Sequence, residues 1–209
     1  MYVGTAVDLY LFDFDKTLYG YDFHHRLPSL SRMSGVSQYD LASSWWGGGF
    51  EARAEAGEWP DADSYLAKFA EVTGARLSLR QWQDARLSAM TRFDGSIEAL
   101  RRCVSLGTVA LFSNNPWIFA ESLPRIAPEV SSLLDGNVVL SCMLRARKPT
   151  LESYERVLEH FGASAGNTFF ADDNPLNIAG ALSVGIVAHH FTTTEFLDEA
   201  ITAFAERTA

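Results

Sequence analysis

Short apolar runs alternate with longer helical patterns over the second half of the chain. The runs that predict strands cover residues 8–14, 108–112, 138–141, 168–171 and 186–189. Such continuous apolar runs are typical of strands that are buried on both faces of a parallel sheet.

Amphipathic helical patterns lie between these runs. Apolar residues recur at helical spacing before Gly107, and again from Leu151 to Phe161 before Gly162. A glycine directly after such a pattern is a common helix stop. The alternation of strands and helices predicts an α/β fold with a doubly wound parallel sheet, a Rossmann-like core.

One stretch interrupts this alternation. Residues 19–92 contain no convincing strand, but Ser37 and Ser78 stand where helices are expected to begin. The stretch is too long for a crossover between neighbouring strands, which usually needs one helix. We therefore predict a core domain from residues 1–18 and 93–209, with a helical cap domain, residues 19–92, inserted into it.

Composition excludes several classes of protein. The chain has 209 residues, 47% of them hydrophobic and 21% charged, as in an ordinary globular protein. A net charge of −9 and no run of basic residues argue against binding to nucleic acid or to an anionic membrane. No signal peptide or membrane-spanning segment is evident. Two isolated cysteines, Cys103 and Cys142, suit a reduced, cytoplasmic setting.

The first predicted strand ends in two carboxylates. Asp13 and Asp15 stand two residues apart and are followed by Lys16 and Thr17. Side chains two apart on a strand share a face, so both carboxylates are expected to point into one pocket. Two anions this close repel each other unless a cation or a shared proton intervenes. A bound Mg²⁺ and an acid/base pair are the two explanations, and they are compatible with each other.

Three more polar clusters follow later predicted strands. They are Ser113 with Asn114, the basic Lys148 before Pro149, and Asp172 with Asp173. Each has an alternative structural explanation: a turn, a solvated basic loop and a helix cap. Their joint occurrence at the carboxyl ends of parallel strands predicts instead a site for Mg²⁺ and phosphate.

With these residues the chain resembles the haloacid dehalogenase superfamily of hydrolases over nearly its whole length. Four motifs carry the resemblance in the family's order: Asp13-Phe14-Asp15-Lys16-Thr17, Ser113, Lys148, and Asp172-Asp173. The helical insert is similar to the family's C1-type cap, which lies between the first and second motifs and covers the site.

The resemblance implies phosphoryl transfer through an aspartyl-phosphate. Asp13 would be the nucleophile and Asp15 the general acid/base, with Thr17 either positioning Asp15 or offering its backbone amide. The family's dehalogenases lack an acid at the position of Asp15, so its presence favours phosphate esters. The resemblance therefore implies that the chain is a phosphoric monoester hydrolase that acts on a small phosphorylated metabolite.

The resemblance also implies the binding residues. Mg²⁺ would be held by Asp13, the backbone carbonyl of Asp15, and Asp173, with Asp172 either a ligand or one shell out. The residues expected to bind the phosphoryl oxygens are Ser113, Asn114 and Lys148. Asn177 is expected to support the metal site from outside.

Substrate choice is expected to depend on the cap. The second and fourth motifs are similar to those of a subgroup with glucose-1-phosphate phosphatases and the N-terminal phosphatase domain of soluble epoxide hydrolase, which points to a sugar phosphate. Cap aromatics such as Trp45 either stack on the substrate or form the core of the cap. The cap is expected to open and close about hinges at residues 19–21 and 92–95. Either a monomer or a homodimer is compatible with the sequence.

Two alternative functions stay open at this stage. His24 and His25 follow Asp15 at about the distance at which sugar-phosphate mutases of the superfamily carry a histidine, although ordinary hinge residues would look the same. A non-catalytic module that binds a phosphorylated ligand or a protein is the other alternative, and it has no direct support because every expected catalytic position is filled.

Overall fold

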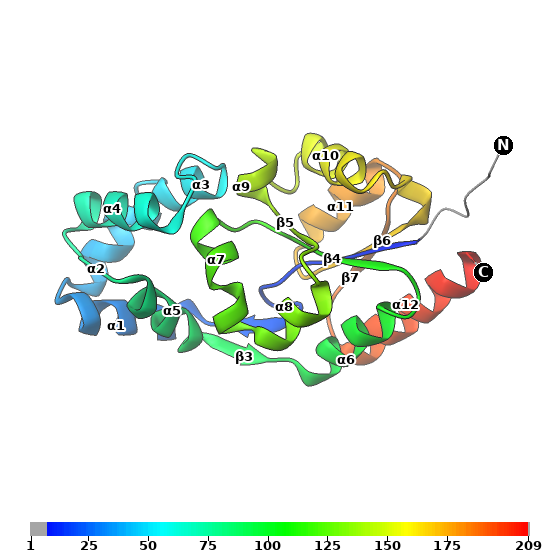
Figure 1. The fold of residues 1–209 in the computed structure, drawn as a ribbon, viewed down its shortest axis with the longest axis horizontal. Helices are drawn as coiled ribbons and strands as arrows, with labels where there is room; N and C mark the ends of the chain where they lie inside the picture. Colours follow the sequence, from blue (N-terminus) through cyan, green and yellow to red (C-terminus); the bar gives the residue numbers. More distant parts are fainter. Residues whose placement is uncertain (1–7, 209) are drawn as a thin grey trace.

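A computed structural model describes residues 8–208 of the chain. Its centre is a five-stranded parallel sheet in the order β5-β4-β1-β6-β7 (Figure 1). The strands are β1 (Leu9–Phe12), β4 (Thr108–Ser113), β5 (Val138–Leu140), β6 (Thr168–Asp172) and β7 (Val187–His190). The predicted α/β class and the parallel sheet are confirmed, because all four neighbouring pairs of strands in this sheet run parallel. Each strand lies within one or two residues of its predicted range.

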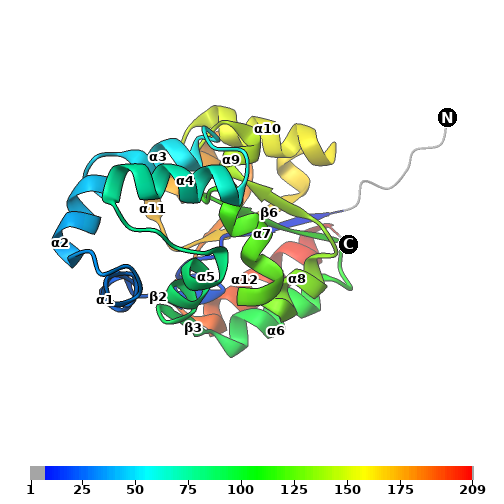
Figure 2. The same ribbon diagram turned by 60° about the vertical axis from the view of Figure 1, so that its left-hand side comes forward.

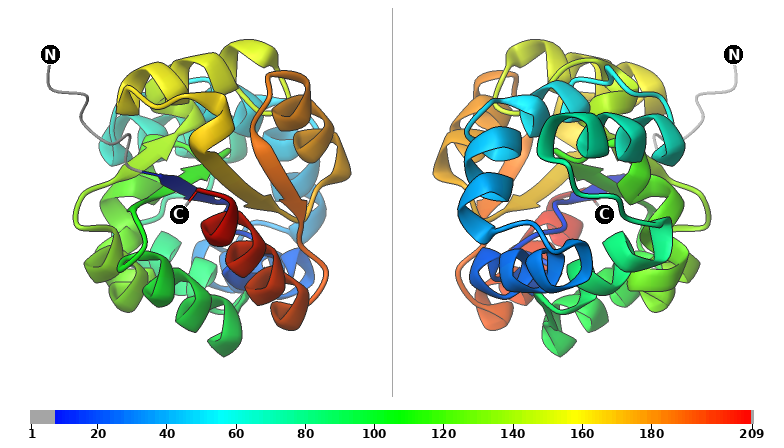
Figure 3. Two further views of the ribbon diagram at one scale, coloured as in Figure 1. Left: turned by 90° about the vertical axis from the view of Figure 1, so that its right-hand side faces the viewer. Right: turned by 90° about the vertical axis from the view of Figure 1, so that its left-hand side faces the viewer.

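Helices cover both faces of the sheet, as Figures 1 and 3 show. One face packs on α10 (Leu151–Phe161) and α11 (Pro175–Ser183). The other packs on α6 (Asp94–Cys103), α7 (Trp117–Ile126), α8 (Pro128–Leu134) and α12 (Thr194–Thr208). The short helices α9 (Ser141–Leu144) and η2 (Ala165–Asn167) complete this part of the fold. Successive β1 residues are buried on opposite faces, which explains its unbroken apolar run.

The inserted stretch is a group of short helices beyond one end of the sheet (Figure 2). They are α1 (Phe23–Ser34), α2 (Gln38–Leu41), the π-helical turn η1 (Ala42–Trp46), α3 (Phe50–Glu55), α4 (Ala62–Thr73) and α5 (Leu79–Leu87). Ser37 and Ser78 cap α2 and α5 with their side chains, as the sequence predicts. Among residues 8–208, no helix is long and apolar enough to cross a membrane.

The prediction that residues 19–92 contain no strand is wrong at both ends of the stretch. β2 (Tyr19–Tyr21) and β3 (Met90–Arg92) pair as an antiparallel ribbon. Strands of three residues are too short to show a period, and the partners lie far apart in the sequence. The ribbon brings the two predicted hinges side by side, so the chain enters and leaves the insert at one place.

The insert shares its apolar core with one face of the sheet. Phe14 stacks on Tyr19 of the ribbon at 5.0 Å between ring centroids and meets Phe119 of α7 edge-on at 4.9 Å. Inside the insert, Trp45 is fully buried among other aromatic rings. Trp45 is thus part of the packing of the insert, the second of the two roles considered for it. The division into a core and a cap domain remains a prediction.

Several contacts dock the insert on the core. The loop after α3 approaches α9 so closely that a Cβ on Gly57 would lie 2.4 Å from the carbonyl oxygen of Cys142. Nearby, Nη2 of Arg147 lies 2.5 Å from Oε2 of Glu55. The backbone N–H of Ala62 donates to Oε1 of Glu121 in α7 at 2.7 Å.

Candidate active site

An open cleft of about 440 Å³ lies at the carboxyl ends of β1, β4 and β6. Ten of its eleven lining residues come from the core or from the loop after β1; Tyr21 of the ribbon is the other. The predicted residues that line it are Asp13, Asp15, Ser113, Asn114, Lys148, Asp173 and Asn177. The structure therefore brings all four predicted motifs to one cleft, as expected from their places after parallel strands.

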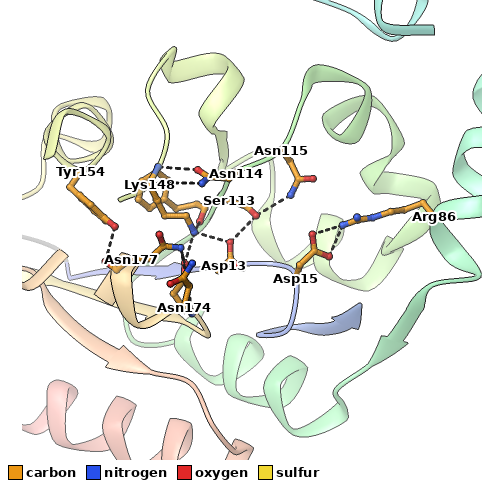
Figure 4. Close-up of polar contacts among 12 residues, drawn as sticks. Asp13, Asp15, Arg86, Ser113, Asn114, Asn115, Lys148, Tyr154, Asn174 and Asn177 are labelled. Atoms are coloured by element: carbon orange, nitrogen blue, oxygen red, sulfur yellow. Dashed lines mark hydrogen bonds and ion pairs between the residues drawn. The ribbon is translucent and has the colours of Figure 1, made fainter. Parts of the chain in front are cut away.

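Asp13 lies at the centre of this cleft and is held from two sides (Figure 4). Its Oδ1 accepts hydrogen bonds from Oγ of Ser113 and from Nζ of Lys148, both at 2.8 Å. The residue is only 7% exposed. Burial raises the pKa of Asp13, Lys148 opposes this effect, and the nearby carboxylate of Asp172 adds to it.

Lys148 is a buried cation with every donor in use. Its Nζ donates to Asp13 at 2.8 Å, to Asp172 at 2.6 Å and to the carbonyl oxygen of Phe112 at 2.8 Å. The side-chain amide of Asn114 fixes the backbone of Lys148 by two hydrogen bonds, of 2.9 and 3.0 Å. Burial tends to lower the pKa of Lys148, but the two carboxylates outweigh it and raise the pKa, so the ammonium stays charged.

The two adjacent acids after β6 have different environments. Asp172 is fully buried, and its oxygens accept bonds from Nδ2 of Asn177, the N–H of Asn174 and Lys148. Asp173 is half-buried and lines the cleft. Burial, followed by the charge of Asp172, raises the pKa of Asp173.

The carboxylates form a group that fits a hard divalent cation. One oxygen from each of Asp13, Asp172 and Asp173 can be chosen so that all three lie within 4.8 Å of one another. Carboxylate oxygens are the ligands that Mg²⁺ prefers, and a cation between them would relieve their mutual repulsion. The donor set therefore fits the expected metal.

Asp15 reaches the same cleft in a different way from that predicted. β1 ends at Phe12, so Asp13 and Asp15 follow the strand, and Lys16 beyond them has a left-handed backbone with φ of 62°. The two carboxylates therefore do not share a strand face as predicted, although both line one pocket. The loop, not the pleat of the strand, sets the direction of Asp15.

Sequence reasoning missed the partner of Asp15. Nη2 of Arg86, in helix α5 of the insert, lies 2.5 Å from Oδ1 and 2.6 Å from Oδ2 of Asp15. The arginine is almost completely buried. A signal was present, because Arg86 follows the apolar Trp82 by one helical turn and so falls on the buried side of α5.

Other residues near the cleft differ in their contacts. Asn115, which was not predicted, donates from Nδ2 to Oγ of Ser113 at 3.0 Å and so orients that hydroxyl. Thr17 is buried, and its hydroxyl has no hydrogen-bond partner within residues 8–208. His24 and His25 lie at the exposed start of α1 and do not line the cleft at Asp13.

The chain is similar to known proteins at the level of family and fold. A family model described as haloacid dehalogenase-like hydrolase matches residues 7–185. The sesquiterpene phosphatase astK of Aspergillus oryzae is 43% identical over 60 residues, which are 29% of this chain and 30% of that protein. The match thus spans less than a third of the curated relative.

Solved structures share the fold at low sequence identity. A predicted HAD-like hydrolase from Porphyromonas gingivalis has a TM-score of 0.75 and 20% identity, over 95% of this chain and 97% of its own. A HAD family enzyme from Bacteroides thetaiotaomicron, solved as a complex with magnesium and inorganic phosphate, has a TM-score of 0.69 and 20% identity, over 89% and 94%. At this level of identity these similarities establish the architecture alone.

Proposed function

Because this chain belongs to the haloacid dehalogenase-like hydrolases, we propose that it is an Mg²⁺-dependent phosphatase of small phosphorylated metabolites. Its membership makes it a hydrolase, and a phosphatase is among its relatives. The observation that carries the proposal is the buried carboxylate of Asp13, which faces an open polar cleft beside Lys148 and two further acids.

Asp13 is the nucleophile in this proposal. Its carboxylate attacks phosphorus, and the bond from phosphorus to the leaving oxygen breaks while Asp15 gives that oxygen a proton. Asp15 then takes a proton from water, which attacks the aspartyl-phosphate and releases phosphate from Asp13. The hydrogen bonds from Ser113 and Lys148 keep the attacking carboxylate in place.

The phosphoryl oxygens are bound by the donors around Asp13. Lys148, the hydroxyl of Ser113 and the backbone N–H of Asn114 are the groups proposed for this role. In the free site Lys148 and Ser113 donate to Asp13, so each would redirect that hydrogen bond to the phosphoryl group once Asp13 carries it. Lys148 also balances part of the negative charge of Asp13 and Asp172, without which the buried acids would repel an anionic substrate. The charge on Lys148 thus compensates the carboxylates in the free enzyme and attracts the phosphoryl group when substrate is bound.

We assign the metal to Asp13, Asp173 and the backbone carbonyl of Asp15. When bound, Mg²⁺ would supply positive charge that allows an anionic carboxylate to meet an anionic phosphate. Asp172 is the remaining acid of the group. Because Asn177, Asn174 and Lys148 already occupy its oxygens, we propose that Asp172 orients Lys148 and supports the metal site.

For the substrate we propose a sugar phosphate, since the cleft is lined mainly by polar side chains. The relative from Aspergillus oryzae is named a sesquiterpene phosphatase, so a prenyl phosphate belongs in any substrate panel. The mutase alternative rested on His24 and His25, and neither residue lines the cleft at Asp13.

Phosphate release tests the proposal directly. Sugar phosphates, nucleotides, a prenyl phosphate and p-nitrophenyl phosphate are each incubated with the enzyme in Mg²⁺ or in EDTA. The variant Asp13→Asn removes the nucleophile, and Asp63→Asn, on the exposed side of α4, is its matched control. We expect release that needs Mg²⁺, persists in Asp63→Asn and is lost in Asp13→Asn. Release that survives in Asp13→Asn would contradict the mechanism, and no release from any ester would contradict the function.

A further inference from the structure

The acid/base residue of the proposed mechanism is held by the insert. Arg86 extends from α5 to the loop after β1, where Nη2 contacts both carboxylate oxygens of Asp15 at 2.5 and 2.6 Å (Figure 4). The side chain of Arg86 is 4% exposed and that of Asp15 is 28% exposed. This ion pair therefore joins the insert to the core at the reacting end of the cleft, largely out of water.

The guanidinium of Arg86 has its own supports. Its central carbon lies 4.3 Å from the ring centroid of Tyr21 in the β2–β3 ribbon and 5.3 Å from that of Phe119 in core helix α7. Cations are attracted to the faces of aromatic rings, and more strongly where water is excluded. The ribbon, the insert and the core thus all help to fix the position of this one group.

Asp15 has no comparable support from its own domain. Within residues 8–208, Arg86 is the only hydrogen-bond partner of its carboxylate. Asp13, by contrast, is held by Ser113 and Lys148, both from the core. The orientation of the nucleophile is therefore a property of the core alone, whereas that of Asp15 depends on a docked insert.

We propose that Arg86 is a positioning residue that aims the carboxyl group of Asp15 at the leaving oxygen when the insert is docked. This inference rests on the proposed phosphatase function. Arg86 exchanges no proton: Asp15 gives its proton to the leaving oxygen and regains one from the attacking water. Because Nη2 contacts both oxygens of Asp15, it can keep one oxygen in place while the other carries the proton.

The proposal predicts a dependence on the leaving group. An alkoxide leaves poorly and needs a well-aimed proton, whereas p-nitrophenolate leaves without one. Misdirecting Asp15 should therefore slow the cleavage of alkyl phosphates selectively. A merely structural role for Arg86 would slow all esters by the same factor.

The experiment measures kcat/KM, which reports the steps through phosphoryl transfer to Asp13, for esters ranging from alkyl to p-nitrophenyl phosphate. For Arg86→Gln we expect a loss of about a hundredfold on alkyl phosphates, in the usual range for general acid catalysis, and less than about tenfold on p-nitrophenyl phosphate. Arg86→Lys should recover part of the loss. Arg80→Gln, on the exposed side of α5, is the matched control and should resemble the wild type.

Two further variants make the test robust. When Asp15 is already replaced by asparagine, Arg86→Gln should lower kcat/KM little further, because Arg86 acts through Asp15. If Arg86→Gln does not fold, Phe119→Leu removes one ring from the guanidinium and should give a smaller loss with the same leaving-group dependence.

The outcomes separate this inference from the proposed function. Equal losses on all esters, or full additivity of Asp15→Asn and Arg86→Gln, would overturn the positioning role and leave the phosphatase intact. A wild-type protein that hydrolyses no ester would overturn the function, and the inference with it.

Discussion

Replacing Lys148 by methionine is expected to cost this protein much of its stability. The change keeps an unbranched side chain but removes the ammonium that lies 2.8 Å from Asp13 and 2.6 Å from Asp172. These three side chains are 1%, 10% and 0% exposed, so water screens their interaction little. Removing one partner of a buried ion pair costs about 3–5 kcal/mol, because the remaining charge is left without compensation.

The loss in Lys148→Met should depend on pH. Burial already raises the pKa of Asp13, and Lys148 opposes that rise, so its removal raises the pKa further. A carboxyl group whose pKa is raised in the folded state lowers the stability of the fold at pH values above its pKa in the unfolded chain. Below that value both states are protonated, and the effect on stability vanishes. The deficit should therefore be smallest near about pH 4–5 and grow toward about pH 8, by roughly 1.4 kcal/mol for each unit of added shift.

Urea denaturation in EDTA, at about pH 5 and pH 8, measures both effects. Lys68→Met is the matched control: its Nζ also contacts a carboxylate at 2.8 Å, that of Glu71, but on the surface. It should cost less than about 1 kcal/mol. If Lys148→Met lowers the free energy of unfolding by less than about 1 kcal/mol, equally at both pH values, then removing the ammonium does not leave an uncompensated buried charge, and the reasoning is refuted.

Three other predictions test separate parts of the structure. Mg²⁺ at about a hundred times its dissociation constant should stabilise the wild type by about 2.7 kcal/mol in thermal melts, and an equal effect in Asp173→Asn would contradict its role as a ligand. Gly57→Ala should destabilise the protein by about 1–3 kcal/mol through its clash with Cys142, in addition to the backbone cost of its φ of 87°. Gly35→Ala, with φ of 77° and open space around the new Cβ, measures the backbone cost alone. Equal losses of stability in urea for the two variants would disprove the clash. Burial raises the pKa of Glu55 from 4.5 to about 7, so this group should lower the stability of the wild type by up to about 3 kcal/mol as pH rises across that range. The fall should be smaller by that amount in Glu55→Gln, where the raised pKa of Asp13 still contributes; parallel pH profiles would exclude this.

Local pattern was enough to predict much of this protein. The five parallel strands follow from apolar runs that need no partner to be recognised, and Ser78 marks the start of α5 by a capping box within one turn. The four polar clusters could be assigned to one site because parallel strands deliver their carboxyl ends to one edge. Asp13 and Lys148 meet there at 2.8 Å although they are far apart in the sequence.

What could not be predicted depends on pairings between distant segments. The β2–β3 ribbon joins strands of three residues, too short to be recognised without their partners. Arg86 looks like one of many arginines until the fold brings it to Asp15, 71 positions away in the chain. Asp13 and Asp15 lie in the loop after β1, where Lys16 has a positive φ that its residue type rarely adopts.

The antiparallel ribbon also bears on how such a chain can diversify. Because Tyr19 and Arg92 are paired neighbours, the continuity of the core does not depend on the length of chain between them. Closing a longer loop adds only about 0.6 kcal/mol per doubling of its length. Insertions and deletions between the two strands could therefore accumulate in a lineage while the chemistry around Asp13 stays the same. If Arg86 positions Asp15, every such insertion or deletion must keep a cationic side chain of the insert in contact with the carboxylate of Asp15.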